Sequence, residues 1–81
     1  MSAVRTRLNR ELVTVLAQVL NNRARQLEQH AEILACAARA KATHGRVGEA
    51  DRLSNASRTH GVRAIKVRAL ATATQHREWR S

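Results

Sequence analysis

The chain has 81 residues and a formal net charge of +9, carried by fifteen basic residues against six acidic ones. This length allows one small domain, residues 1–81, and the single cysteine, Cys36, excludes an internal disulfide. No apolar run approaches the roughly 18 residues that a membrane span requires, and the first residues lack an apolar signal region. We therefore expect a cytoplasmic protein with no membrane partner.

The first element predicted along the chain is a long helix over residues 3–43, approximately. Ala, Leu, Arg, Gln and Glu dominate this segment, and the chain contains no Pro. Its apolar residues recur at the helical period, namely Val4, Leu8, Leu12, Val15 or Leu16, Val19, Leu27, Ile33 or Leu34, and Ala37. The pattern weakens at Asn21-Asn22, where a kink or short break fits the sequence.

A turn and a second helix follow. Gly45 and Gly48 suit a helix C-cap and a turn, and Glu49 and Asp51 then fall where the dipole of a new helix favours acids. The second helix is predicted over about 49–77, and residues 59–61 (Thr-His-Gly) mark a second place where it could bend. Whether the first helix continues through Gly45 and Gly48 stays open at this stage.

These elements predict an all-α helical hairpin. The core of one hairpin is thin, because the chain has no Phe or Tyr and relies on Leu, Val, Ile and Ala. A chain this short buries little surface alone, and two copies could share one core. We therefore expect a homodimer in which two hairpins form an antiparallel four-helix bundle.

Basic residues predict a polyanionic partner. Thirteen of the fifteen are Arg, whose planar guanidinium matches phosphate oxygens. Four in the second helix are expected to have no acidic neighbours at all: Arg58, Arg63, Lys66 and Arg68. Residues at helical spacing should also share one face of the first helix, namely Arg25, Gln29, Glu32, Cys36, Arg39 and Arg46. For the first helix alone, an ordinary solvated face is the simpler interpretation. The basic residues of the second helix, which lack acidic neighbours, favour phosphate binding instead.

The absence of known base-reading motifs and of stacking aromatic residues limits the kinds of nucleic acid that the protein could bind. The first helix is too long for a helix-turn-helix, and no Cys and His spacing fits a zinc finger. Without Phe or Tyr there is no platform for stacking single-stranded bases. Binding to a duplex through its phosphates, without base readout, remains, and charge alone suits double-stranded RNA and duplex DNA almost equally.

The segment Ala35-Cys36-Ala37-Ala38-Arg39-Ala40-Lys41, followed by Arg46, resembles the RNA-binding helix of the nodavirus RNA-silencing suppressors. In the insect-virus members a Cys is followed at +3 by a basic residue, at +5 by Lys and at +10 by Arg. The resemblance implies a helical homodimer that lies along one face of double-stranded RNA and shields it from Dicer and from loading of small interfering RNA. Glu28 departs from an upstream basic position of the family, and the family helix continues where this chain has Gly45 and Gly48.

The leading hypothesis is a protein that binds double-stranded RNA without sequence preference and suppresses RNA silencing in the host cytoplasm. Its candidate RNA-binding residues are Cys36, Arg39, Lys41 and Arg46, with Arg58, Arg63 and Lys66 as supporting phosphate ligands. The alternatives are a duplex-DNA-binding accessory protein of a plasmid or phage, and a helical module that docks to an acidic protein. We expect no enzymatic activity, small-molecule substrate, cofactor or metal, because no paired carboxylates, phosphate loop or ligand spacing is present.

Four further residues have expected structural roles. Trp79 is expected to tether the C-terminal end to the bundle in preference to stacking on a base. His30 is expected in the core or an interface, and His44 and His60 in turns. His76 has no assigned role.

Overall fold

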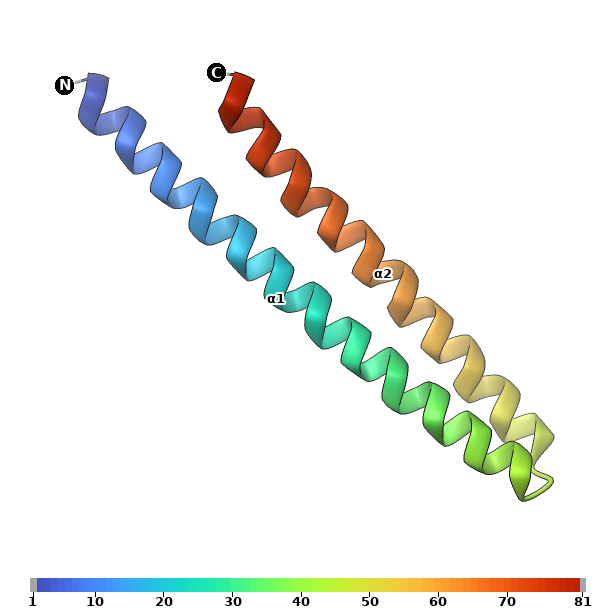
Figure 1. Cartoon of the computed structure of the whole chain (residues 1–81). Coiled ribbons are helices and arrows are strands. Elements are labelled where there is room, and N and C mark those ends of the chain that lie inside the picture. Colours follow the sequence, from blue (N-terminus) through green and yellow to red (C-terminus); the bar gives the residue numbers. More distant parts are fainter. Residues whose placement is uncertain (1, 81) are drawn as a thin grey trace.

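The chain folds into two long helices, α1 (Ser2–Thr43) and α2 (Val47–Arg80), in a computed structural model. The helices run antiparallel, so both termini lie at one end of a rod and the turn lies at the other (Figure 1). The structure describes the backbone of residues 2–80 and the side chains of residues 3–76. The predicted all-α hairpin is confirmed, with α2 beginning two residues earlier than expected. Trp79 lies outside the described side chains.

The turn shows how α1 ends. The backbone N–H of Arg46 donates to the carbonyl of Lys41 at 2.9 Å, and that of Gly45 donates to the carbonyl of Ala42 at 3.1 Å. This pair of bonds is the Schellman motif, which requires a left-handed residue after the helix. Gly45 supplies it with φ of +75°. Arg46 therefore lies in the turn, and Gly48 already belongs to the first turn of α2.

The two breaks considered within the helices are absent. Asn21 and Asn22 remain helical, and the Asn22 Oδ1 accepts a hydrogen bond from Arg25 Nη2 at 2.7 Å. In α2 the hydroxyl of Thr59 donates to the carbonyl of Asn55 at 3.0 Å. These polar side chains satisfy themselves along the helix surface without displacing a backbone bond, so the helices continue.

The two helices meet along a seam of small residues spaced seven apart. On α1 the seam contains Ala17, Ala24, Ala31 and Ala38, and on α2 it contains Ala50, Ser57, Ala64 and Ala71. Six of these eight are alanines with at most 7% of their surface exposed, and Ala24 is fully buried. Ser57 adds a bond across the seam, because its hydroxyl donates to the Ala31 carbonyl at 2.7 Å. A seven-residue repeat keeps one side of each helix on its neighbour, and methyl side chains let the two backbones approach closely.

The seam shows that the apolar pattern predicted in α1 is not the core of the single chain. Of its members only Leu27 is buried, whereas the large residues from Val4 to Val19 remain 48–66% exposed: Val4, Leu8, Leu12, Val15, Leu16 and Val19. At about 100° per residue, these six lie roughly opposite the seam. We call them the α1 outer stripe. Periodicity correctly predicted a helix, but the residues that contact the other helix are mainly alanines and not the large apolar residues.

The resulting body is unusually extended. Its Cα radius of gyration is 18.6 Å, against about 12 Å for a compact chain of this length. The principal extents are 66 × 16 × 11 Å. The described residues thus form one layer of two helices, and within them each helix packs only against the other.

Candidate nucleic-acid interface

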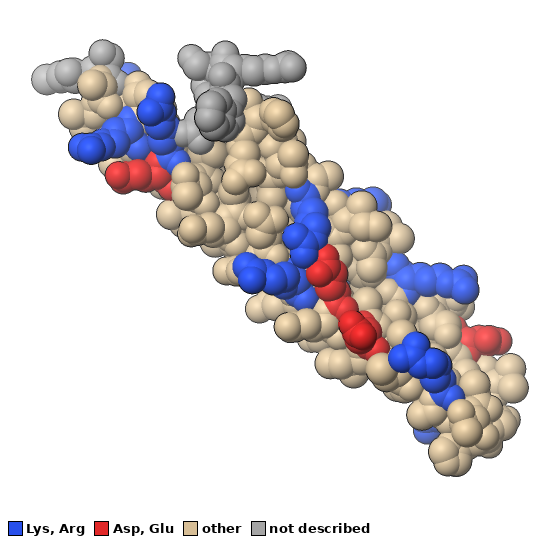
Figure 2. All heavy atoms as spheres, viewed as in Figure 1, with Lys and Arg blue, Asp and Glu red and all other residues tan. Residues whose placement is uncertain are grey.

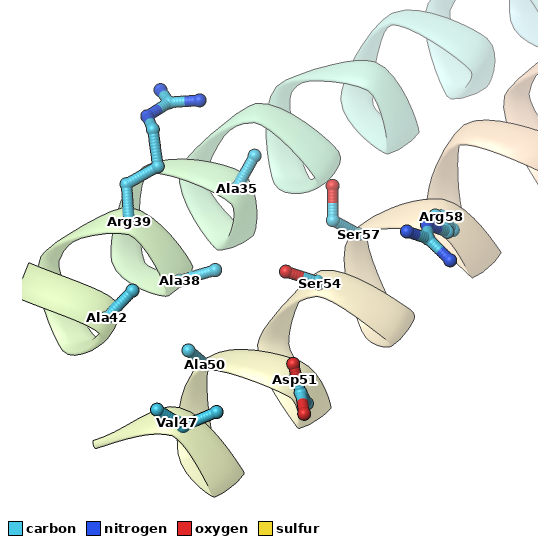
Figure 3. Close-up of a pocket in the computed structure, with 10 residues that line it drawn as sticks. All are labelled: Ala35, Ala38, Arg39, Ala42, Val47, Ala50, Asp51, Ser54, Ser57 and Arg58. Carbon is cyan, nitrogen blue, oxygen red and sulfur yellow. The ribbon is translucent and has the colours of Figure 1, made fainter. Parts of the chain in front are cut away.

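A groove of about 410 Å³ lies between the helices, near the turn. Small residues line it from both sides, Ala35, Ala38 and Ala42 from α1 and Ala50, Ser54 and Ser57 from α2 (Figure 3). Arg39 and Arg58 line its two banks, one from each helix, together with Val47 and Asp51. The groove therefore combines a floor without bulky side chains with an arginine on each bank, one from each helix.

Arg39 is held against the outer surface of α1. Its Nη2 donates to the Sγ of Cys36 at 3.1 Å, and both side chains are exposed. In Figure 3 its guanidinium is directed away from the groove floor. Because a thiol is a weak acceptor, this contact leaves the positive charge uncompensated and the donors available to a stronger acceptor such as a phosphate.

Arg58 is exposed and has no ion pair or hydrogen bond to any residue that the structure describes. Arg63 and Lys66 share this property within the same described part of the chain. They point elsewhere, however. At about 100° per residue, Arg63 is rotated by about 140° and Lys66 by about 80° around α2 from Arg58, and neither lines the groove. The predicted supporting residues are thus free cations on different sides of α2.

Lys41 and Arg46 have a different environment from Arg39. The Nζ of Lys41 lies 3.2 Å from Glu49 Oε2, and the Nη1 of Arg46 lies 3.8 Å from the same oxygen. Lys41 is also rotated by about 200° around α1 from Arg39, so the two side chains leave opposite sides of the helix. The structure brings together Cys36, Arg39 and the groove, and it places Lys41 and Arg46 around a shared carboxylate at the turn.

Arg68 has the acidic partner that its sequence neighbourhood did not reveal. Its Nε and Nη2 donate to the two carboxylate oxygens of Glu28 at 2.6 and 3.0 Å. The hydrogen bond from Arg68 holds the pKa of the Glu28 carboxyl below its ordinary value, and the same bond raises the pKa of Arg68. The prediction that Arg68 lacks an acidic neighbour is therefore wrong, because the partner is 40 residues away in sequence.

Charge elsewhere is spread along the rod. Figure 2 shows basic side chains along the visible length, with acidic ones between them midway. Within the described residues, Arg25 donates a hydrogen bond to the amide of Asn22 and its charge acts on Glu28, whereas Arg52 has no hydrogen bond or ion pair. Positive charge thus lies along much of the rod, and the groove is where two arginines from different helices flank small residues.

The histidines were only partly predicted. His60 lies within α2 and not in a turn, and its ring meets that of His30 edge-on with centroids 5.9 Å apart. His44 does lie in the turn, with its Nδ1 2.7 Å from the Ala40 carbonyl. Among the described residues, no three His, Cys, Asp or Glu side chains gather as metal ligands would. In the same part of the chain, neither helix combines the length and apolar character of a membrane span.

Sequence reasoning missed the groove floor and the seam beneath it. The signal that could have found them is the spacing of seven between small residues on both helices. The chain matches no protein-family model, and no curated protein or solved structure shows significant similarity to it. The protein is therefore characterised by its structure alone, as an antiparallel pair of basic helices with a groove that two arginines flank.

Proposed function

We propose that this protein binds double-stranded RNA through phosphate contacts, without sequence preference, and suppresses RNA silencing by covering the duplex. It acts by binding and not by catalysis. The observation that carries the proposal is the groove, because Arg39 and Arg58 line it from two different helices. A strand that crosses the groove can present successive phosphates to both guanidinium groups, while the small residues between them let the sugar-phosphate backbone come close.

Duplexes are favoured over single strands because the chain has one aromatic residue besides its histidines, and single-strand binders rely on stacking. RNA is favoured over DNA by the resemblance of Cys36 and Arg39 to the nodavirus suppressors. The length of 66 Å corresponds to about 19 base pairs of B-form DNA at 3.4 Å per pair, and to somewhat more base pairs of A-form RNA, whose rise per pair is smaller. A rod of this size can therefore contact a duplex over about two turns.

Self-association belongs to the same proposal, and the α1 outer stripe is the surface that fits it. The chain exposes 6654 Å², whereas a compact protein of 9.0 kDa exposes about 4,900 Å². The excess of roughly 1,800 Å² per chain is what an obligate homodimer commonly covers. A second copy packed through its own stripe removes six large apolar side chains from water in each protomer, and it leaves the groove uncovered at the far end of the rod.

Fluorescence anisotropy with 30-base-pair RNA and DNA duplexes tests the binding. We expect the RNA duplex to bind more tightly, with an affinity that falls steeply as salt rises. Replacing Arg39 and Arg58 together with Ala should lower the salt slope by about 1.8 for each groove that contacts the duplex, because each lost duplex phosphate contact removes about 0.9. Affinity should fall at least about a hundredfold, since the two lost charge-assisted hydrogen bonds together contribute about 3–6 kcal/mol.

Arg52→Ala is the matched control. Arg52 is also an unpaired arginine of α2, but it does not line the groove. The Arg52→Ala variant should lose only general electrostatic attraction, so its affinity for the duplex should fall only a few-fold. Tighter binding of DNA would favour the duplex-DNA accessory protein, and no binding to either duplex at moderate salt would favour a module for an acidic protein. A Dicer cleavage assay completes the test, because the wild type should protect the RNA and the double variant should not.

Sedimentation velocity tests the dimer separately. Leu12→Glu places a charge in the middle of the stripe and should give a monomer at concentrations where the wild type is a dimer. Val62→Glu adds the same charge at an exposed apolar position of α2, outside the stripe, and should leave the dimer intact. Equal behaviour of the two variants would refute this placement of the interface.

A further inference from the structure

The polar groups of the groove differ in whether they already form hydrogen bonds within the protein. Of its two hydroxyls, that of Ser57 donates to the Ala31 carbonyl at 2.7 Å, across the seam. That of Ser54 has no hydrogen-bond partner among the described residues, although Ser54 is half-buried and lines the groove. A serine within a helix often bonds back to the carbonyl one turn earlier, as Thr43 and Thr59 do here. Ser54 does not, so its hydroxyl remains available to a ligand.

The place of Ser54 within the groove decides what it can reach. It lies between the two banks, with Arg58 one turn later on the same helix and Arg39 on the other (Figure 3). In a nucleic-acid strand the sugar lies between successive phosphates. If the two arginines hold phosphates, the sugar of that strand therefore lies over the floor, where the remaining α1 side chains are the methyl groups of alanines.

Asp51 is the second unused polar group of the groove. It lies one turn before Ser54 on α2 and has no ion pair or hydrogen bond to a described residue. A carboxylate beside a phosphate-binding groove repels any nucleic acid. Asp51 is exposed and hydrated in the free protein, and it favours binding of a nucleic acid only where the ligand brings a hydroxyl that can donate to it. The ribose 2′-hydroxyl is the donor that RNA has and DNA lacks.

We propose that Ser54 and Asp51 read the ribose 2′-hydroxyl and make this groove selective for RNA over DNA. Ser54 can both donate to and accept from the 2′-hydroxyl, and Asp51 accepts from it. In a DNA duplex neither group gains a partner, and the Asp51 carboxylate is left facing the phosphates without compensation. The selectivity arises from two short polar side chains and needs no contact to the bases. This inference rests on the proposed binding of duplexes through Arg39 and Arg58.

The test compares three duplexes of identical sequence, all RNA, all DNA and 2′-O-methyl RNA, in the anisotropy assay. Ser54→Ala should weaken binding to RNA about three- to tenfold, the loss expected for one hydrogen bond, and leave binding to DNA unchanged. Asp51→Asn should strengthen binding to DNA more than binding to RNA. The wild type should bind the 2′-O-methyl duplex more weakly than RNA, because the methyl group removes the donor while the A-form shape is kept.

Ser57→Ala is the matched control, since it removes a hydroxyl of the same groove that is already used within the protein. It should alter stability and leave the ratio of RNA to DNA affinity unchanged. A wild type that binds neither duplex would overturn the proposed function itself. A wild type that prefers RNA, with a ratio unaffected by Ser54→Ala and Asp51→Asn, would overturn only this inference and assign the preference to duplex shape.

Discussion

Replacing Ala24 with Leu tests whether the alanine seam holds the hairpin together. Ala24 is 0% exposed, and Ala64, its counterpart across the seam, is 1% exposed. A leucine adds three carbon atoms where only a methyl group fits, so the helices must separate or the side chain must leave its preferred rotamer. Overpacking of this kind typically costs about 1–3 kcal/mol.

That loss is large for a chain of this size, whose total stability is expected to be about 4–12 kcal/mol. With about 4–8 °C of melting temperature per kcal/mol, the variant should melt about 4–24 °C below the wild type. Thermal unfolding followed by far-ultraviolet circular dichroism measures the shift. All proteins must be compared at one concentration, because self-association makes the melting temperature depend on it.

Ala40→Leu is the control, because Ala40 belongs to the same helix but is exposed. Leu has nearly the helix propensity of Ala, so this variant should melt close to the wild type. If Ala24→Leu melted at the same temperature as Ala40→Leu, or higher, the two helices would not be in close contact at Ala24. The seam would then have been placed on the wrong side of α1.

Two further predictions concern the turn at Gly45 and the ion pair between Glu28 and Arg68. Gly45→Ala should lower the melting temperature by about 4–8 °C, since a φ of +75° costs an L residue about 1 kcal/mol, whereas Gly48→Ala should leave it unchanged or raise it. Equal effects would contradict the left-handed turn. Glu28→Gln should lower the melting temperature modestly at pH 7, through loss of the ion pair with Arg68. Because the folded pKa of Glu28 is depressed, the contribution of its carboxylate is present above the unfolded value of about 4.3 and lost as pH falls through the folded pKa. The difference between wild type and variant should therefore vanish in strong acid, and a difference that persists there would refute the role of the charge.

The helices themselves were predictable because helix formation depends on local sequence. The absence of Pro, the helix-favouring composition and the glycines at 45 and 48 placed both helices to within three residues of their observed ends. The two breaks considered at 21–22 and 59–61 failed for a related reason. Polar residues such as Asn22 and Thr59 lower helix propensity slightly, but their side chains find partners along the helix, and packing against the other helix stabilises the rest.

The candidate site was predicted only in part. Basic character, the proximity of Cys36 to Arg39 and the free charge of Arg58 follow from composition and helical spacing. The sequence did not show that Lys41 and Arg46 share Glu49, nor that Arg63 and Lys66 leave α2 on other sides. It also did not show the groove, because a groove between two helices depends on which residues of one helix lie opposite those of the other.

The sequence by itself therefore determined a basic, two-helix chain, because charge and helix propensity are properties of residues and of their near neighbours. Only the tertiary structure decided the register of the two helices. That register buries alanines while the α1 outer stripe stays exposed, pairs Glu28 with Arg68, and joins Arg39 and Arg58 across one groove. The physical reason is that two helices approach most closely where their side chains are smallest. A prediction based on the large apolar residues does not identify those positions.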